Sequence, residues 1–380
     1  MHSEHETNIA TSKEIAASGD SRRNFLKKTG VGLAALSALS VAGAPALAAG
    51  KTSQPDYPAP PEGADNFYVS DKVTIKKVSF RDQYSMRIVG NLITPNNLKT
   101  GRTPAIIVGH PMGAVKEQSA MLYAQKMAEQ GFVTLAIDLP FWGESAGEPR
   151  NLVAPEMYAE AFSAAADYLG SQDFIDRDRI GVIGICGSGG FSISAAKMDP
   201  RLKAIATVSM YDMGAVTRNG LNQSVSVQQR KTLIAKGAEQ RNSEYASGKG
   251  IFLNYLPVKI GLDADAVTRE FWEFYRTPRG IVVPKGETLE QTQNRMLSSE
   301  IRFVNFYPFN DIATISPRPL LFITGDKAHS KEFSEAAYRQ AAEPKELYYV
   351  PGAGHVDLYD RANMIPWNKL TAFFKQHLTA

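Results

Sequence analysis

The sequence holds one cysteine, Cys186, in a segment that is typical of a catalytic nucleophile. An apolar run at 180–185 precedes it and a glycine-rich run at 187–190 follows it, which predicts a strand, a tight turn and a helix. The residues two positions away, Gly184 and Ser188, are small enough for such a turn. Free N–H groups at the start of the helix would stabilise a thiolate and a developing oxyanion. We therefore predict that Cys186 attacks a carbonyl carbon.

Three other interpretations of this segment are open. A lone cysteine is often a buried, inert side chain. A dinucleotide-binding loop would need a glycine where Ser192 stands, and the sequence lacks the Gly-Lys-Ser/Thr of a phosphate-binding loop. Ser188 could itself be the nucleophile, but its neighbour two positions earlier would then be Cys186 instead of a glycine. We favour Cys186 because the glycine-rich turn is centred on it.

A histidine near the C-terminus is placed to act as the general base. His355 follows an apolar run at 346–350 and a glycine-rich loop at 351–354, so it is expected on a loop directly after a strand. His110 and His329 are the alternatives. The remaining histidines lie ahead of an arginine pair in the N-terminal segment or on the terminal helix: His2, His5 and His377.

A turn at 110–113 follows the short apolar run 105–109 and is expected to face the start of the helix after the cysteine. A backbone N–H of Met112 or Gly113 would then lie opposite the N–H of Gly187. Two donors directed at one point stabilise the oxyanion of a tetrahedral intermediate. We predict Met112 and Gly187 as this oxyanion hole; the alternative is an ordinary turn between a strand and a helix.

Segments that look like strands and helices alternate from residue 71 onward. Segments 73–80 and 87–93 alternate apolar and polar residues, which predicts an antiparallel hairpin. The later alternation predicts an α/β fold with a mostly parallel sheet and helices on both faces. Strands are expected at 105–109, 132–137, 180–185, 204–210, 319–324 and 346–350, and helices at 117–130, 155–169, 189–198 and 365–377.

The alternation lapses between residues 213 and 312, where the sequence is prone to helix and rich in aromatic residues. We predict that 213–312 is a helical cap inserted into a core formed by 71–212 and 313–380. Most of these aromatic side chains are expected in the core of the cap, and some are expected to line a pocket.

The first 48 residues are typical of an export signal. An arginine pair at 22–23 precedes Phe-Leu-Lys, and the segment ends in Ala-Leu-Ala at 46–48. It closely resembles the bacterial twin-arginine signal, whose translocation machinery exports folded proteins. The apolar part is too short to span a membrane securely. We predict cleavage after Ala48, a periplasmic or secreted protein with no stable membrane association, and an extended leader at 49–70.

Composition excludes several classes of protein. Hydrophobic residues make up 43% and charged residues 21%, which is typical of a globular chain, and the net charge of +3 gives no case for a nucleic-acid partner. A single cysteine rules out an intrachain disulfide and any site with several cysteine ligands. No His-Glu-x-x-His motif occurs, so we expect neither a metal nor another cofactor.

Four motifs, taken in order, carry a family resemblance: the turn at 110–113, the segment 138–147, the cysteine turn and Gly-x-Gly-His at 352–355. In this order the chain resembles the α/β-hydrolase fold over nearly its whole length after the signal. Segment 138–147 is similar to the D-x-x-G-x-G-x-S-x-G loop of that fold, with the middle glycine replaced. The cysteine turn is similar to that of dienelactone hydrolases, and this resemblance implies a Cys–His–Asp triad. The large cap departs from those compact enzymes.

The acid of the triad is the least regular part of the resemblance. Many members of the fold have Gly-x-x-Asp after the strand predicted at 319–324, but here Ala328 stands at the aspartate position and Asp326 comes two residues earlier. We predict Asp326 as the acid. Asp212, at the end of the strand predicted at 204–210, is the alternative.

These residues predict hydrolysis of an ester, thioester or lactone through an acyl-cysteine intermediate. Cys186 would attack a small-molecule acyl substrate, and His355 would accept and return the proton. Two alternatives are open. An acyltransferase would use the same residues with an alcohol or amine as acceptor, and a non-catalytic binding protein on this scaffold would explain the irregular acid.

Overall fold

In a computed structural model, the structure describes residues 57–98 and 101–378. The predicted signal and the first part of the predicted leader lie outside the described residues. None of the helices that the structure describes is long and apolar enough to cross a membrane.

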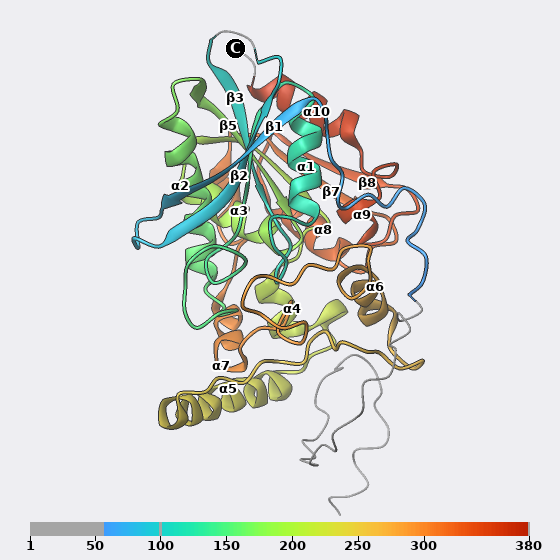
Figure 1. Ribbon diagram of the computed structural model, residues 1–380. Helices are drawn as coiled ribbons and strands as arrows, with labels where there is room; N and C mark the ends of the chain where they lie inside the picture. Colours follow the sequence, from blue (N-terminus) through green and yellow to red (C-terminus); the bar gives the residue numbers. More distant parts are fainter. Residues whose placement is uncertain (1–56, 99–100, 379–380) are drawn as a thin grey trace, which may run out of the picture. The chain divides into compact units, whose positions relative to one another are not determined.

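Eight strands form one sheet in the order β1-β2-β4-β3-β5-β6-β7-β8 (Figure 1). The first two strands pair as the predicted antiparallel hairpin, β2 runs antiparallel to β4, and every pair from β4 to β8 is parallel. The prediction of a mostly parallel sheet is therefore confirmed. The strands are β1 (Val73–Arg81), β2 (Arg87–Pro95), β3 (Thr103–Gly109), β4 (Val133–Ile137), β5 (Ile175–Ile185), β6 (Leu202–Val208), β7 (Leu320–Gly325) and β8 (Lys345–Val350).

The short apolar runs of the sequence form the centre of the sheet because both faces of these strands are covered. Every residue of β4 and β7 is buried. The hairpin differs from its predicted pattern, since β2 is buried at six consecutive positions, 88–93. Only β1, at the edge of the sheet, is mostly exposed.

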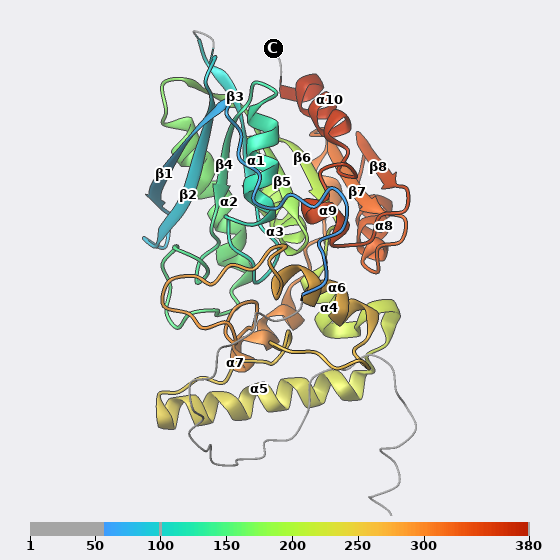
Figure 2. The ribbon, with the colours of Figure 1, turned by 45° about the vertical axis from the view of Figure 1, so that its right-hand side comes forward.

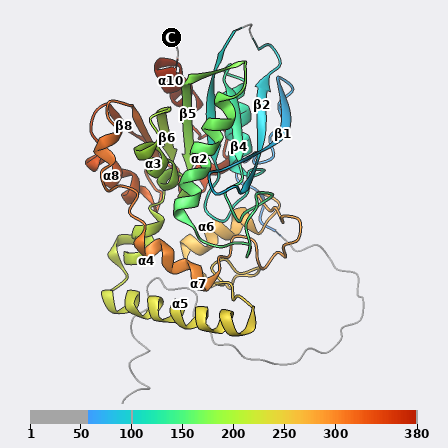
Figure 3. The same cartoon turned by 90° about the vertical axis from the view of Figure 1, so that its left-hand side faces the viewer.

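Helices cover the two faces of the sheet, as predicted. The helices α1 (Ser119–Ala128) and α10 (Trp367–Leu378) lie on one face (Figure 2). The helices α2 (Pro155–Gly170), α3 (Gly187–Met198) and α8 (Lys331–Gln340) lie on the other face (Figure 3). The helix α8 was not among the predicted elements.

The chain between β6 and β7 lies at the end of the sheet where the parallel strands end (Figures 1 and 2). In α/β proteins this edge is where ligands bind. Three of its helices carry side-chain N-terminal caps, from Asp212, Ser226 and Asp265. The helices are α4 (Met213–Asn219), α5 (Val227–Ser247), α6 (Ala266–Tyr275) and α7 (Leu297–Glu300), with 3-10 turns η1 (Leu221–Gln223), η2 (Ile301–Asn305) and η3 (Ile312–Ile315).

The segment 57–70 packs along the C-terminal part of the chain. Ala64 forms an isolated β-bridge with Arg361, and the Asp65 N–H donates to the Asp360 carbonyl at 2.9 Å. The Tyr57 ring lies 6.3 Å from the ring of Trp272 on α6. This segment therefore contacts both the chain around α9 (Asp357–Asp360) and the region between β6 and β7.

Candidate active site

Cys186 lies at the sharp turn between β5 and α3. Its backbone has φ 53° and ψ −119°, a conformation that non-glycine residues rarely adopt and that costs on the order of 1–3 kcal/mol. A Cβ on Gly184 would lie 2.4 Å from the Ser188 carbonyl oxygen, so that position requires glycine. The strand, strained turn and helix have the geometry of a nucleophile elbow.

Ser188, the residue two positions after the cysteine, fits into the turn because of a glycine on the neighbouring strand. Its hydroxyl donates to the His110 carbonyl at 2.5 Å. A Cβ on Gly109, at the end of β3, would lie 2.7 Å from the same hydroxyl oxygen. The Ser188 side chain is fully buried and holds α3 against β3.

The predicted oxyanion donors meet at the cysteine. The backbone N–H groups of Gly187 and Met112 both interact with the Cys186 thiol. They approach closely because residue 187 has no side chain: a Cβ there would lie 2.8 Å from the Met112 Cβ. The structure therefore brings Cys186, Met112 and Gly187 together.

His355 is fully buried on the loop after β8, and both of its ring nitrogens have hydroxyl partners. Its Nδ1 lies 2.5 Å from the Ser330 hydroxyl, and its Nε2 lies 2.9 Å from the Tyr359 hydroxyl. The Ser209 hydroxyl donates to the His355 carbonyl at 2.9 Å and fixes the loop. Burial, together with the nearby His329, holds the pKa of His355 well below its usual range, so the imidazole is neutral.

Tyr359, on α9, connects the histidine to the cysteine. Its hydroxyl interacts with the Cys186 thiol as well as with Nε2 of His355. Its ring is fully buried and packs edge-on against Phe274, at a centroid distance of 5.3 Å. The sequence analysis did not identify this residue, although a tyrosine four positions after a histidine lies within reach of the same face of a helical turn.

The cysteine is a neutral thiol in this environment. Burial raises the pKa of Cys186 to about 11, although the Tyr359 hydroxyl and the N–H groups of Gly187 and Met112 act to lower it. We expected the start of α3 to stabilise a thiolate, but desolvation outweighs that effect. The thiol and imidazole are thus both uncharged at neutral pH, and a proton must move when sulfur attacks.

Neither predicted acid forms a hydrogen bond with the histidine among the described residues. Among the described residues, the hydrogen-bond partner of Nδ1 is the Ser330 hydroxyl. Asp326 instead accepts from the Gly352 N–H at 2.8 Å. Asp212 caps α4 by accepting from the Ala215 N–H at 2.7 Å. Ala328 at the Gly-x-x-Asp position was the signal that this part of the site departs from the usual pattern, but it did not identify Ser330.

The other candidate histidines occupy different places. His110 is buried, with its Nε2 accepting from the Leu139 N–H at 3.1 Å, so it supports the loop after β4. His329 lies beside His355, at a ring centroid distance of 4.7 Å. Its Nδ1 pairs with Glu270 of α6 at 3.0 Å, and Glu270 also accepts from the Val356 N–H at 2.7 Å. Glu270 therefore ties α6 to the loop that carries His355.

Aromatic side chains surround the imidazole of His355. Tyr211 and Phe271 contact its ring edge-on, at centroid distances of 5.1 and 5.4 Å. Phe271 belongs to α6, so the region between β6 and β7 contributes directly to the site. A mainly apolar, water-poor environment of this kind strengthens the hydrogen bonds inside it. The arrangement is suited to nucleophilic attack by sulfur on an uncharged acyl group.

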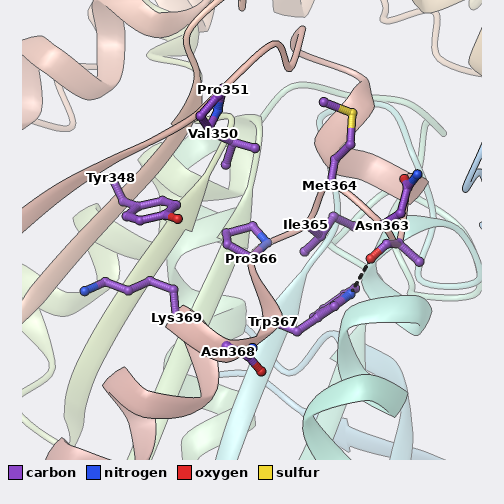
Figure 4. Close-up of a pocket in the computed structure, with 11 residues that line it drawn as sticks. Tyr348, Val350, Pro351, Asn363, Met364, Ile365, Pro366, Trp367, Asn368 and Lys369 are labelled. Atoms are coloured by element: carbon purple, nitrogen blue, oxygen red, sulfur yellow. Dashed lines mark hydrogen bonds between the residues drawn. The ribbon is translucent and has the colours of Figure 1, made fainter.

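A separate pocket of about 500 Å³ lies between β8 and the start of α10 (Figure 4). Pro366 and Trp367 line it, and the Trp367 Nε1–H donates to the Ala362 carbonyl at 2.9 Å. None of the predicted site residues lines this pocket. The predicted site residues lie elsewhere, around Cys186, where the backbone is strained and the two N–H donors converge.

A metal site would require several ligand side chains that lie close together. Residues 57–98 and 101–378 contain no group of three or more His, Cys, Asp or Glu side chains that could hold a metal ion.

Comparison with known proteins places the chain in a family. The sequence model of the dienelactone hydrolase family matches residues 88–244. The uncharacterized protein PA2218 of Pseudomonas aeruginosa is 44% identical over 315 residues, which cover 82% of this chain and 83% of that protein. The crystal structure of PA2218 matches 85% of this chain and 99% of that chain with a TM-score of 0.78.

Two more distant proteins extend the comparison. The acyltransferase drtE of Aspergillus calidoustus is 23% identical over 77% of this chain and 91% of that protein. The α/β-hydrolase GrgF from Penicillium sp. sh18 is 21% identical, covers 80% of this chain and 99% of that chain, and has a TM-score of 0.66. The predicted α/β-hydrolase fold is thus confirmed. The chain belongs to the same family as PA2218, with a dienelactone hydrolase domain on an α/β-hydrolase fold.

Proposed function

We propose that this protein hydrolyses an ester, thioester or lactone through a covalent acyl-cysteine at Cys186. The observation that carries the proposal is the convergence of two backbone N–H groups, from Gly187 and Met112, on a thiol held at a strained elbow. Such a pair of donors stabilises the oxyanion that forms when a nucleophile adds to a carbonyl. The match of residues 88–244 to the sequence model of the dienelactone hydrolase family supports the same chemistry.

The reaction would proceed in two halves. Sulfur of Cys186 adds to the carbonyl carbon while its proton passes to His355, and the leaving group departs with that proton. Water then attacks the acyl-cysteine while His355 takes a proton from it. The C–S bond breaks as the acid is released, and the proton returns from His355 to the sulfur of Cys186. A thiol nucleophile favours activated acyl groups over amides, so peptide bonds are poor substrates.

We propose Ser330 in place of Asp326 as the group that orients the histidine. The Ser330 hydroxyl lies at Nδ1 of His355, where the third member of a triad acts, whereas Asp326 holds the Gly352 N–H. An acceptor at Nδ1 fixes the tautomer in which Nε2 is free to take a proton.

Turnover of p-nitrophenyl acetate by the full-length protein tests the proposal. The wild type is expected to release nitrophenol with a burst, and Cys186→Ala and His355→Ala are expected to lose at least 100-fold in kcat/KM. Mass spectrometry of the quenched wild type should show one acetyl group on Cys186. Equal turnover by the wild type and Cys186→Ala would refute the enzymatic role, and no turnover of any activated ester or thioester would favour a binding protein.

An acyltransferase is the second candidate, because the relative drtE is an acyltransferase that aligns over most of the chain. The low exposure of Cys186, 5%, favours an acyl-cysteine that is protected from water. Addition of short alcohols to the p-nitrophenyl acetate assay separates the two. A transferase should give acetyl esters in large excess over acetate, and a hydrolase should give acetate.

We also propose that the protein is exported in folded form by the twin-arginine machinery, as the N-terminal sequence predicts. Replacement of both arginines at 22–23 by lysine should leave the protein in the cytoplasm. Fractionation of cells that produce the two forms provides the measurement.

A further inference from the structure

We propose that Tyr359 relays the proton between Cys186 and His355, so that the base acts on the thiol through a phenol. This inference rests on the proposed function and assigns a further catalytic residue to the same site. Its basis is the position of one hydroxyl group, which contacts both the thiol and Nε2 of the imidazole.

The direction of each hydrogen bond follows from the tautomer of His355, and one tautomer suits the relay. If Nδ1 of His355 donates to the Ser330 oxygen, Nε2 carries no hydrogen and accepts from the Tyr359 hydroxyl. While sulfur keeps its proton, the thiol of Cys186 can donate to the Tyr359 oxygen. Once sulfur has lost that proton, the Tyr359 hydroxyl donates to it, and this is the interaction that acts to lower the pKa of Cys186. All donors therefore point the same way along the series Cys186, Tyr359, His355 and Ser330, which is the arrangement that proton transfer requires.

The helix that carries Tyr359 is held from three sides. Asp360 forms a buried salt bridge with Arg279, at 2.6 Å, which links α9 to the region between β6 and β7. The Tyr123 hydroxyl on α1 donates to the Leu358 carbonyl at 2.6 Å. The Asp65 N–H donates to the Asp360 carbonyl. With the backbone fixed on both sides of it, the phenol is held in position before substrate binds, as a relay needs.

The proton movements balance in both directions. When sulfur bonds to the carbonyl carbon, the S–H bond breaks and its proton joins the Tyr359 oxygen, while the phenolic proton moves to Nε2. Tyr359 stays neutral, His355 becomes imidazolium and the carbonyl oxygen becomes the oxyanion. When the intermediate collapses, the bond to the leaving group breaks and a proton returns through Tyr359 to that group.

The surroundings keep the tyrosine from ionising by itself. Burial, and then the proximity of Cys186, raise the pKa of Tyr359 well above its usual range. Burial therefore disfavours a free phenolate, and in the relay the two protons move together. The ionisable groups around the site are His329 and Glu270, the tyrosines 211, 255 and 275, and Arg295.

Alkylation of Cys186 by iodoacetamide tests the relay, because the chain has no other thiol. In the wild type, relayed removal of the proton should make the rate nearly independent of pH between pH 6 and 9. In Tyr359→Phe only the free thiolate reacts, so the rate should rise about tenfold for each pH unit and be about 100-fold slower than wild type at pH 7.

Tyr123→Phe is the matched control. It removes another buried hydroxyl that holds α9, but this hydroxyl contacts a backbone carbonyl instead of the reacting groups. The control should keep the flat wild-type profile even if its melting temperature falls. If the alkylation rate of Tyr359→Phe depends on pH as the wild-type rate does, the relay is overturned, whatever the absolute rate is. A faster reaction of the variant would also overturn it, by showing that the hydroxyl blocks the thiol.

A second measurement needs no variant. In mixtures of H₂O and D₂O, relayed alkylation of the wild type moves two protons, so the rate should fall along a curve as the deuterium fraction rises. A straight line, which indicates one moving proton, overturns the relay. Neither alkylation experiment uses an acyl substrate, so failure of the relay and failure of the proposed hydrolysis are distinguishable.

Discussion

The hydroxyl of Ser330 lies 2.5 Å from Nδ1 of His355, at the position where the resemblance to dienelactone hydrolases implies a carboxylate. A carboxylate there would stabilise an imidazolium and raise the pKa of the histidine. A hydroxyl orients the ring without adding charge. This difference is consistent with a histidine that stays neutral and a thiol that keeps its proton until substrate is bound.

Ser330→Ala should therefore impair catalysis more than Asp326→Asn does. Loss of the hydroxyl frees the imidazole to adopt either tautomer, and we expect kcat/KM for p-nitrophenyl acetate to fall at least tenfold, or about 1.4 kcal/mol. Asp326→Asn keeps an oxygen that can accept from the Gly352 N–H, so activity should stay within about threefold. The opposite order would restore Asp326 as the acid.

Replacement of the strained cysteine should separate stability from activity. Cys186→Gly and Cys186→Ala should both be inactive, but glycine adopts φ 53° without strain. We expect the glycine variant to unfold with a free energy about 1 kcal/mol higher than that of the alanine variant, measured in urea. A more stable alanine variant would mean that the elbow is not strained.

Asp212 should make stability depend on pH. Burial raises its pKa from 3.8 to about 6, so the folded chain binds its proton more tightly than the unfolded chain does. Its contribution is fully present below pH 3.8 and is lost as pH rises through about 6. Relative to wild type, Asp212→Asn should gain about 2 kcal/mol of unfolding free energy between pH 4 and pH 8.

Urea unfolding of both proteins at the two pH values gives that difference, because the contributions of all other titratable groups are the same in both proteins and cancel. Asparagine still caps α4, so the helix is retained. A difference that does not change with pH would show that the carboxylate is solvated in solution.

The salt bridge between Arg279 and Asp360 should matter for both folding and turnover. Both side chains are buried, and Arg279→Met leaves an unpaired carboxylate, which should cost about 3–5 kcal/mol. Because α9 carries Tyr359, the folded fraction should also lose activity. The double variant Arg279→Met with Asp360→Leu should recover most of the stability, and thermal unfolding of the four proteins completes the cycle. If the stability losses of the two single variants simply add up in the double variant, a direct interaction between Arg279 and Asp360 is contradicted.

The parts of the molecule that follow from local sequence were predictable. Short apolar runs identify the buried strands because each strand needs both faces covered, and the small residues around Cys186 identify the turn. Met112 and Gly187 could be predicted to lie near Cys186 because each comes within three residues of the end of such a strand.

Ser330 and Tyr359 could not be found in the same way. Ser330 lies on the loop after β7, and its contact with His355 depends on how two loops after neighbouring strands fold toward each other. Tyr359 reaches the site because α9 is only one turn long and is held by residues from distant parts of the chain. Such contacts between loops leave no periodic pattern in the sequence. Asp326 was predicted from its position near the Gly-x-x-Asp motif, in which Ala328 stands at the aspartate position, and it stays a prediction.

The contact between segment 57–70 and α9 limits when the site can be completed during synthesis of the chain. Ala64 and Asp65 are synthesised before Cys186, and their partners at 360–361 are synthesised after it. The turn that carries Tyr359 cannot be completed before both have emerged. In a partly synthesised chain, Cys186 would therefore lack the proposed proton relay through Tyr359. The thiol would become reactive only when the whole fold has formed.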